Sequence, residues 1–130
     1  MKEILEKILK EEGYNPKRDE DNDIIVKYQG VTFVVLADSE FTFVRVWLPK
    51  FWSLESQEEF AKAHILANRL NKEYRVGKII IDDDNDTNCF AEFFIDKADI
   101  QLKDIFLRMF VILFGMRLEF AQLMNADQQH

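Results

Sequence analysis

The pattern of apolar and polar positions predicts three helices and five strands along this chain. Apolar residues recur at the three- and four-residue spacing of a helix face in three segments, and short β-branched or aromatic runs bounded by turn residues mark five others. In chain order, the predicted elements are a helix over Lys2–Glu12, strands over Ile24–Tyr28, Val31–Leu36 and Phe41–Leu48, a helix over Gln57–Glu73, strands over Lys78–Asp82 and Thr87–Ile95, and a helix from Asp99 to Met124. This order, α-β-β-β-α-β-β-α, is typical of a single α+β domain, here residues 1–130, in which helices flank a twisted antiparallel sheet.

Turn and capping residues indicate where these elements begin and end. Gly13 is expected to stop the first helix, because glycine adopts the left-handed conformation that ends many helices. Pro49 is expected to end the third strand, because it has no N–H to donate to a sheet. Ser56 and Glu59 match the capping box that begins a helix, and Asp99 is the expected N-cap of the last helix.

The third predicted strand carries apolar side chains on both faces of the sheet. Every second residue of a strand points to the same face, so Phe41, Phe43, Arg45 and Trp47 form one set, and the set between them is also mostly apolar. A sheet with one face in water shows a polar set there instead. Three helices can leave one face uncovered, so a partner protein or a second copy of the chain could supply the cover.

The last predicted helix is apolar around almost its whole circumference. Its narrow polar stripe is interrupted in the middle by Val111 and Gly115, whereas a surface helix usually has a broad polar side. Such a helix is either central to the core or part of an interface. The sequence leaves both alternatives open, and Val111 and Gly115 are candidate interface residues.

Arg117 and Trp52 are further candidates for partner contacts, each with a structural alternative. Arg117 falls among apolar residues of the last helix, where an unpaired buried charge would cost several kcal/mol. We expect it to form a structural ion pair, with stacking on an aromatic ring or access to water at an interface as alternatives. Trp52 is expected in a loop before the second helix, where it would hold that helix in place or, if exposed, bind a partner.

Composition and charge narrow the classes of partner. The 130 residues carry a net charge of −7, which disfavours nucleic acid and anionic membranes, because both attract clustered lysine and arginine. The one cysteine, Cys89, excludes an intrachain disulfide, and we expect it to be a buried thiol. No signal peptide and no membrane-spanning segment are predicted, so a cytoplasmic protein is expected.

His64, Asn68 and Asn71 form a candidate ligand pocket on the second predicted helix. Helical spacing places the three on neighbouring positions of the helix surface, and a histidine with two amides could orient a small ligand or act as a base. No serine, cysteine or aspartate at matching spacing completes a nucleophilic set. The favoured alternative is structural: these side chains bond to backbone at a sheet edge or to one another.

The acidic run Asp82–Asp86 invites comparison with a calcium loop. Three of its aspartates match the first ligand positions of an EF-hand, but Thr87 stands where the glycine is needed and Phe93 where the bidentate glutamate is needed. We therefore expect a solvated hairpin loop. The sequence predicts neither a metal site nor a cofactor.

The order of elements and three short segments resemble the YbjN-like family, which is akin in fold to type III secretion chaperones. The segments are 11–14 (EEGY), 41–49 (FTFVRVWLP) and 67–71 (ANRLN). The resemblance implies a bacterial protein with a twisted antiparallel sheet flanked by helices, often as a dimer. Related chaperones hold extended segments of other proteins. The family has no catalytic motif to transfer to this chain.

Two hypotheses of function follow from the sequence. The first is a non-catalytic protein-binding module, chaperone-like or regulatory, which forms a homodimer and holds a polypeptide segment on apolar sheet or helix surface. The alternative is a small-ligand sensor or regulatory domain with a pocket near the second helix. An enzyme is not expected, because no phosphate loop, metal cluster or nucleophile–base pair can be identified.

Overall fold

One antiparallel sheet and three helices dominate the described parts of the chain. The computed structural model describes residues 1–38, 43–96 and 99–126. Their elements, in chain order, are α1 (Lys2–Glu11), β1 (Lys17–Arg18), β2 (Ile24–Tyr28), β3 (Val31–Asp38), β4 (Phe43–Ser53), α2 (Gln57–Glu73), β5 (Lys78–Ile81), β6 (Asp86–Phe94) and α3 (Leu102–Asn125). The strand order is β1-β2-β3-β4-β6-β5, with antiparallel neighbours throughout. The predicted α+β class and element order are confirmed, and β1 is an additional short strand.

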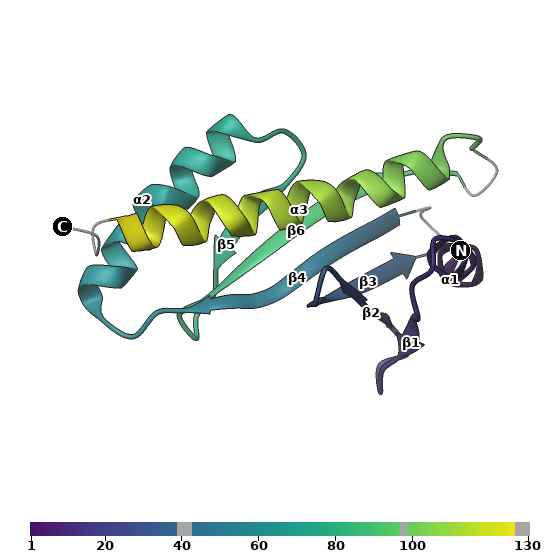
Figure 1. Ribbon diagram of the computed structural model, residues 1–130, viewed down its shortest axis with the longest axis horizontal. Helices are drawn as coiled ribbons and strands as arrows, with labels where there is room; N and C mark the ends of the chain where they lie inside the picture. The colour runs from purple at the N-terminus through teal and green to yellow at the C-terminus, as the bar shows by residue number, and fades with distance from the viewer. Residues whose placement is uncertain (39–42, 97–98, 127–130) are drawn as a thin grey trace.

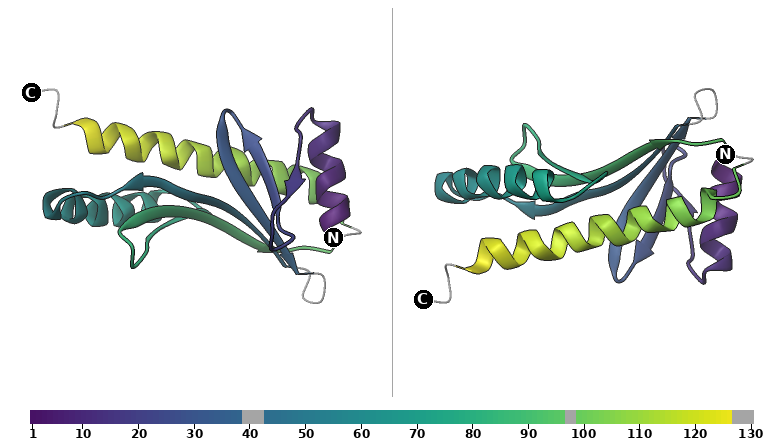
Figure 2. Two further views of the ribbon diagram at one scale, coloured as in Figure 1. Left: turned by 90° about the horizontal axis from the view of Figure 1, so that it is seen from below. Right: turned by 90° about the horizontal axis from the view of Figure 1, so that it is seen from above.

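The long helix α3 runs along one face of the curved sheet (Figure 1 and Figure 2). At its first turn, Lys103 forms a 2.9 Å ion pair with Glu12, which follows α1. The second half of α3 packs beside α2, which also contacts the edge strand β5. All three helices therefore contribute to one core, and the face of β4 that carries Val44, Val46 and Leu48 is fully buried in it.

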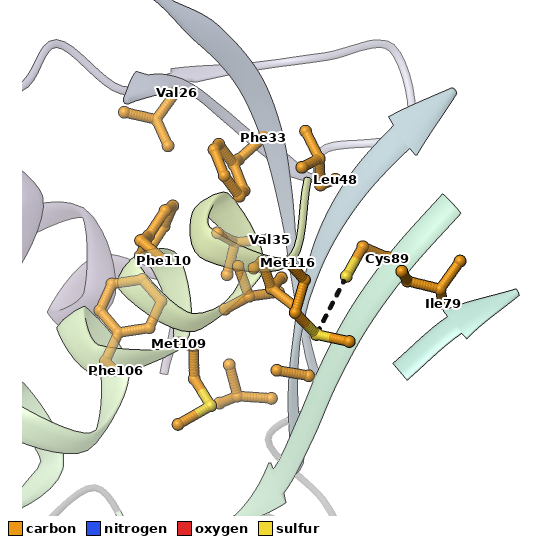
Figure 3. Close-up of a cluster of buried hydrophobic side chains, with 14 of the residues drawn as sticks. Val26, Phe33, Val35, Leu48, Ile79, Cys89, Phe106, Met109, Phe110 and Met116 are labelled. Atoms are coloured by element: carbon orange, nitrogen blue, oxygen red, sulfur yellow. Dashed lines mark hydrogen bonds between the residues drawn. The ribbon is translucent and has the colours of Figure 1, made fainter. Parts of the chain in front are cut away.

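Large aromatic and aliphatic side chains from the sheet and α3 fill this core (Figure 3). Phe33 of β3 meets Phe110 of α3 with 5.1 Å between ring centroids, and Phe106 meets the same Phe110 ring edge-on at 5.3 Å. Burying each phenylalanine stabilises the fold by about 1.5–3 kcal/mol. This aromatic contact fixes the first half of α3 on the sheet.

Strand β4 does not end at Pro49, as the sequence predicted, but continues to Ser53. Leu48 pairs with Cys89 and Trp52 pairs with Thr87, so the register with β6 shifts between them and forms a bulge. A bulge tolerates proline because the bulged residues do not all take part in the ladder. Lys50, at a φ of 46°, completes the local change of direction.

The continuation of β4 also changes the role of Trp52. The sequence predicted a loop residue that holds α2 in place, whereas Trp52 lies in β4 and contacts Phe120 of α3 edge-on at 6.0 Å. Phe51 contacts the same ring at 5.4 Å. These half-buried aromatic residues therefore fix the second half of α3 on the sheet, which the expected loop could not do.

The starts of α2 and α3 differ in how well the sequence predicted them. Ser56 caps α2 as expected, with its Oγ accepting a 3.1 Å hydrogen bond from Glu59 N. For α3 the predicted cap is wrong by two residues: Gln101 is the N-cap and has no side-chain cap bond. Asp99 instead accepts a 2.8 Å bond from Gln101 N, which stabilises the turn that precedes the helix.

Candidate functional site on the open face of the sheet

The face of the sheet opposite α3 is covered by no helix or strand that the structure describes (Figure 2). We call it the open face, and in β4 and β6 it consists of Phe43, Arg45, Trp47, Asn88, Phe90, Glu92 and Phe94. Cross-strand register places Phe43 opposite Phe94, Arg45 opposite Glu92 and Trp47 opposite Phe90. Phe94 is 77% exposed. Part of the exposed apolar surface therefore lies on this face, and part lies on α2 and α3.

A stack of side chains occupies the centre of the open face. Arg45 Nη2 lies 2.8 Å from Glu92 Oε1, and the guanidinium carbon lies 4.9 Å from the centre of the Phe90 ring. The Phe90 and Trp47 rings are parallel within 7°, with 5.8 Å between their centroids. Each of these side chains contacts its neighbour, and restraint of this kind lowers the entropy lost on binding.

Asn88 fixes the orientation of the Trp47 indole through a hydrogen bond. It is 5% exposed, and its Oδ1 accepts 3.1 Å hydrogen bonds from Trp47 Nε1 and from Lys50 N in the bulge. Its Nδ2 donates to Asp82 Oδ2 at 2.9 Å. Asp82 also accepts from the backbone N–H groups of Asp86 and Asp84, and these bonds hold the pKa of its carboxyl below the usual value. The network joins β4, β6 and the β5–β6 turn.

A hollow of about 380 Å³ opens over this network and the stack. It is lined by Arg45, Trp47, Ile80, Asp82, Asn88, Phe90 and Glu92. Ile80 of β5 is 51% exposed and adds an aliphatic wall. The volume is at the lower end of the range of small-molecule pockets, about 300–1,000 Å³, and is enough for one or two side chains of a partner. The chemistry available is stacking, apolar contact and ion pairing.

Comparison with known proteins agrees with this fold. The family model YbjN, described as "Putative bacterial sensory transduction regulator", matches residues 2–119. The chain belongs to the YbjN family. Among curated proteins, none matches it significantly.

Two solved structures share the fold of this YbjN-family chain. The type III secretion chaperone SycH of Yersinia pestis, solved in complex with a stable fragment of YscM2, is 13% identical with a TM-score of 0.63. The match covers 92% of this chain and 98% of SycH. An uncharacterized protein from Methanothermobacter thermautotrophicus is 15% identical with a TM-score of 0.59, over 97% of each chain. At these identities the similarity is one of fold.

On α3 of this YbjN-family chain, the outward face carries two of the predicted interface residues, Val111 and Gly115, and also Leu118, which the sequence did not single out. Val111 is 59% exposed and Leu118 is 43% exposed, with Gly115 between them. Glu119, expected in the polar stripe, instead accepts a 2.8 Å hydrogen bond from Tyr74 Oη. Burial and this bond raise the pKa of Tyr74 to about 12. The outward face of α3 therefore combines the apolar Val111 and Leu118 with the exposed polar residues Asp104, Arg108 and Gln122.

The ion pair predicted for Arg117 is wrong. Its guanidinium carbon lies 5.9 Å from the centre of the Phe114 ring, and within the described ranges no carboxylate lies at ion-pair distance. The side chain is partly exposed, so water and the ring face accommodate its charge. Stacking, one of the alternatives considered from the sequence, is what the structure contains.

The structure does not bring His64, Asn68 and Asn71 together around a pocket. His64 is exposed and packs edge-on against Phe60, with ring centroids 4.3 Å apart, and Asn68 is exposed. Asn71 Nδ2 donates to Ile79 O at 3.0 Å, and its Oδ1 accepts from Ile79 N at 2.7 Å. The structural alternative, bonding to backbone at a sheet edge, is confirmed for Asn71.

Some site residues escaped the sequence reasoning. Asn88, Ile80 and Glu92 line the hollow, but their role depends on the register between strands, which no local pattern in the sequence reports. Phe41, predicted as part of the same surface, lies outside the described residues.

Cys89, also considered in the sequence, lies away from the open face. Cys89 points into the core, with its Sγ 3.7 Å from Met116 Sδ, and burial raises the pKa of its thiol to about 12 (Figure 3). A thiol of this kind is a poor nucleophile at neutral pH. None of the described helices is long and apolar enough to cross a membrane.

Proposed function

We propose that this chain is a non-catalytic regulatory module that holds an extended segment of a partner protein against the open face of its sheet. The observation that carries the proposal is the contiguous stack of Trp47, Phe90 and Arg45, which no described element covers. Tryptophan and arginine in ordered, partly buried positions are the residues that most often dominate binding energy at protein interfaces.

The comparisons support a partner protein as the ligand. SycH shares the fold and was solved with a fragment of another protein, YscM2. The family description names a regulator of sensory transduction, which is a role that works through binding. The hollow at the centre of the open face has room for side chains of such a segment.

The proposal includes a homodimer formed through the outward face of α3. Val111, Gly115 and Leu118 recur at spacings of four and three residues, which is the spacing of a helix–helix seam. Pairing two copies there would remove Val111 and Leu118 from water and leave the open faces free for partner segments. A cytoplasmic location belongs to the same proposal.

Peptide binding tests the role of the open face. Segments of candidate partners, presented as a peptide panel, should bind the protein, and Trp47→Ala and Phe90→Ala should each weaken binding about tenfold or more, as expected of residues at the centre of an interface. Ile65→Ala is the matched control, because Ile65 is 69% exposed on α2. Photo-crosslinking from position 94 should capture the same peptides.

The result that would refute this function is equally specific. If peptides bind as tightly to Trp47→Ala and Phe90→Ala as to the unaltered chain, the open face is not their site. Loss of binding in Ile65→Ala alone would move the site to α2.

A further inference from the structure

The hollow on the open face combines an aromatic floor with acidic ends. Trp47 and Phe90 form the floor, and Ile80 forms a wall. Asp82 lies at one end, bonded to Asn88, and Glu92 lies four residues further along β6. At about 3.3 Å per residue, Asn88 and Glu92 are separated by about 13 Å along β6.

The acidic character extends beyond the hollow into the turn between β5 and β6. The chain as a whole carries −7. The carboxylates in and beside the hollow are Asp82, Asp83, Asp84, Asp86 and Glu92. Asp83 and Asp84 are exposed, so their charge acts on whatever approaches this end of the sheet. This is the acidic run for which the sequence offered no specific function.

Arg45 neutralises Glu92, whereas Asp82, Asp83, Asp84 and Asp86 have no ion-pair partner among the described residues. Arg45 is paired with Glu92 and lies over Phe90. Lys78, opposite Phe90 in register, turns its Nζ toward the carbonyl oxygens of Asn71, Tyr74 and Gly77 at 3.2–3.4 Å, away from the hollow. Lys50 is exposed and contributes least among the causes that lower the pKa of Asp82.

We propose that the hollow binds an arginine or lysine side chain of the partner segment, flanked in that segment by apolar residues. A cation over an indole ring is attracted by the ring's electron-rich face, its aliphatic stem can lie on Ile80, and its tip can reach the Asp82 carboxylate. The flanking residues would contact the rings of Phe43 and Phe94 at one end, and at the other the side of Trp47 next to β3, where Val34 is its cross-strand partner. The inference rests on the proposed function and names the chemistry of its partner.

Four blocked pentapeptides test the inference. Each has valine and leucine residues on both sides of a central residue, which is arginine, lysine, norleucine or glutamate. In the Trp52→Phe variant, Trp47 is the one remaining indole, so its fluorescence reports binding. Calorimetry measures the affinities of the Trp47→Ala variant, which lacks this fluorescence signal. The arginine and lysine peptides should bind about tenfold more tightly than the norleucine peptide, and the glutamate peptide most weakly. High salt should reduce the difference.

Charge variants locate the effect at the hollow. Asp83→Asn with Asp84→Asn, and separately Glu92→Gln, should weaken the arginine peptide about threefold or more and leave the norleucine peptide unchanged. Asp21→Asn is the matched control, because Asp21 is exposed in the β1–β2 turn at the other edge of the sheet.

The outcomes separate this inference from the proposed function. If the norleucine peptide binds as tightly as the arginine peptide and Trp47→Ala weakens both, the preference for a cation is overturned and segment binding on the open face stands. If no peptide binds, or if binding is unaffected by Trp47→Ala, both are overturned.

Discussion

Asn71 of α2 makes two hydrogen bonds to the backbone of Ile79, on the side of the edge strand β5 that faces away from β6. Its amide both donates to Ile79 O and accepts from Ile79 N, at 3.0 and 2.7 Å. In an antiparallel pair, alternate residues direct their N–H and C=O groups to opposite sides, so the groups of Ile79 that meet Asn71 point away from β6. Exposed edge strands recruit other strands, and this side chain occupies the position that an added strand would use.

We predict that Asn71→Ala destabilises the protein and makes it prone to aggregation. The substitution leaves one partly buried N–H and one C=O without partners, which costs about 1–3 kcal/mol, and it opens the β5 edge. Urea denaturation measures the loss, and light scattering at high concentration measures association. Asn68→Ala, an exposed position on the same helix, should change stability by less than about 0.5 kcal/mol. Equal urea midpoints for the two variants would contradict the capping role.

Two glycines near the α2–α3 contact should respond to alanine in opposite directions. A Cβ at Gly77 would lie 2.6 Å from Met116 Sδ and 3.1 Å from Ile112 Cγ2, so Gly77→Ala should destabilise by about 1–3 kcal/mol through overpacking. Gly115 lies inside α3, and a Cβ there would meet only Tyr74 Oη at an ordinary 3.7 Å. Gly115→Ala should therefore stabilise by up to about 1 kcal/mol. Thermal unfolding of both variants tests the pair, and a shift in the same direction would refute it.

Local signals explain which parts of the fold could be predicted. The bounds of α2 were predictable because the Ser56 cap and the helical period lie within a few neighbouring residues. The bulge after Pro49 was not, because it depends on Asn88, a residue of β6 that accepts a bond from Lys50 N. Strand β1 has two residues, and its position depends on pairing with β2 and on an ion pair with α1. Elements set by distant contacts leave little trace in a local pattern.

The candidate site was predictable in part for the same reason. Alternation along β4 correctly grouped Phe43, Arg45 and Trp47 on one face. It could not pair Trp47 with Phe90 or Arg45 with Glu92, because β4 and β6 are separated in sequence by α2 and β5 and their register is a long-range property. The hollow exists only through that register.

The ion pair between Glu6 and Arg18 should contribute to stability in a pH-dependent way. Arg18 Nε and Nη2 donate to the two Glu6 oxygens at 2.8 and 2.6 Å, and this hydrogen bonding lowers the pKa of Glu6 below its ordinary 4.5. Because the folded-state pKa is the lower one, the stabilisation is fully present above pH 4.5 and is lost as the pH falls through the lowered value.

We therefore predict that Glu6→Gln unfolds more easily than the unaltered chain at pH 7, and that the two stabilities converge as the pH falls to 3. Urea unfolding across this range measures the difference. Glu20→Gln, at an exposed position in the β1–β2 turn, is the control and should follow the unaltered chain at every pH. A constant difference between Glu6→Gln and the unaltered chain from pH 7 to 3 would show that the pair is not the origin of the effect.

The proposed dimer gives the last prediction. In a two-fold symmetric interface each residue occurs twice, so a charge introduced at its centre repels its own copy. Light scattering over a range of concentrations should give twice the 15.5 kDa chain mass for the unaltered protein and the single mass for Val111→Lys with Leu118→Lys. Both positions are exposed in one copy, so the monomer should still fold. Ile65→Lys, at an exposed position on α2, should leave the dimer intact. A monomeric unaltered protein would refute the homodimer, and a dimer that survives the double substitution would place the interface away from α3.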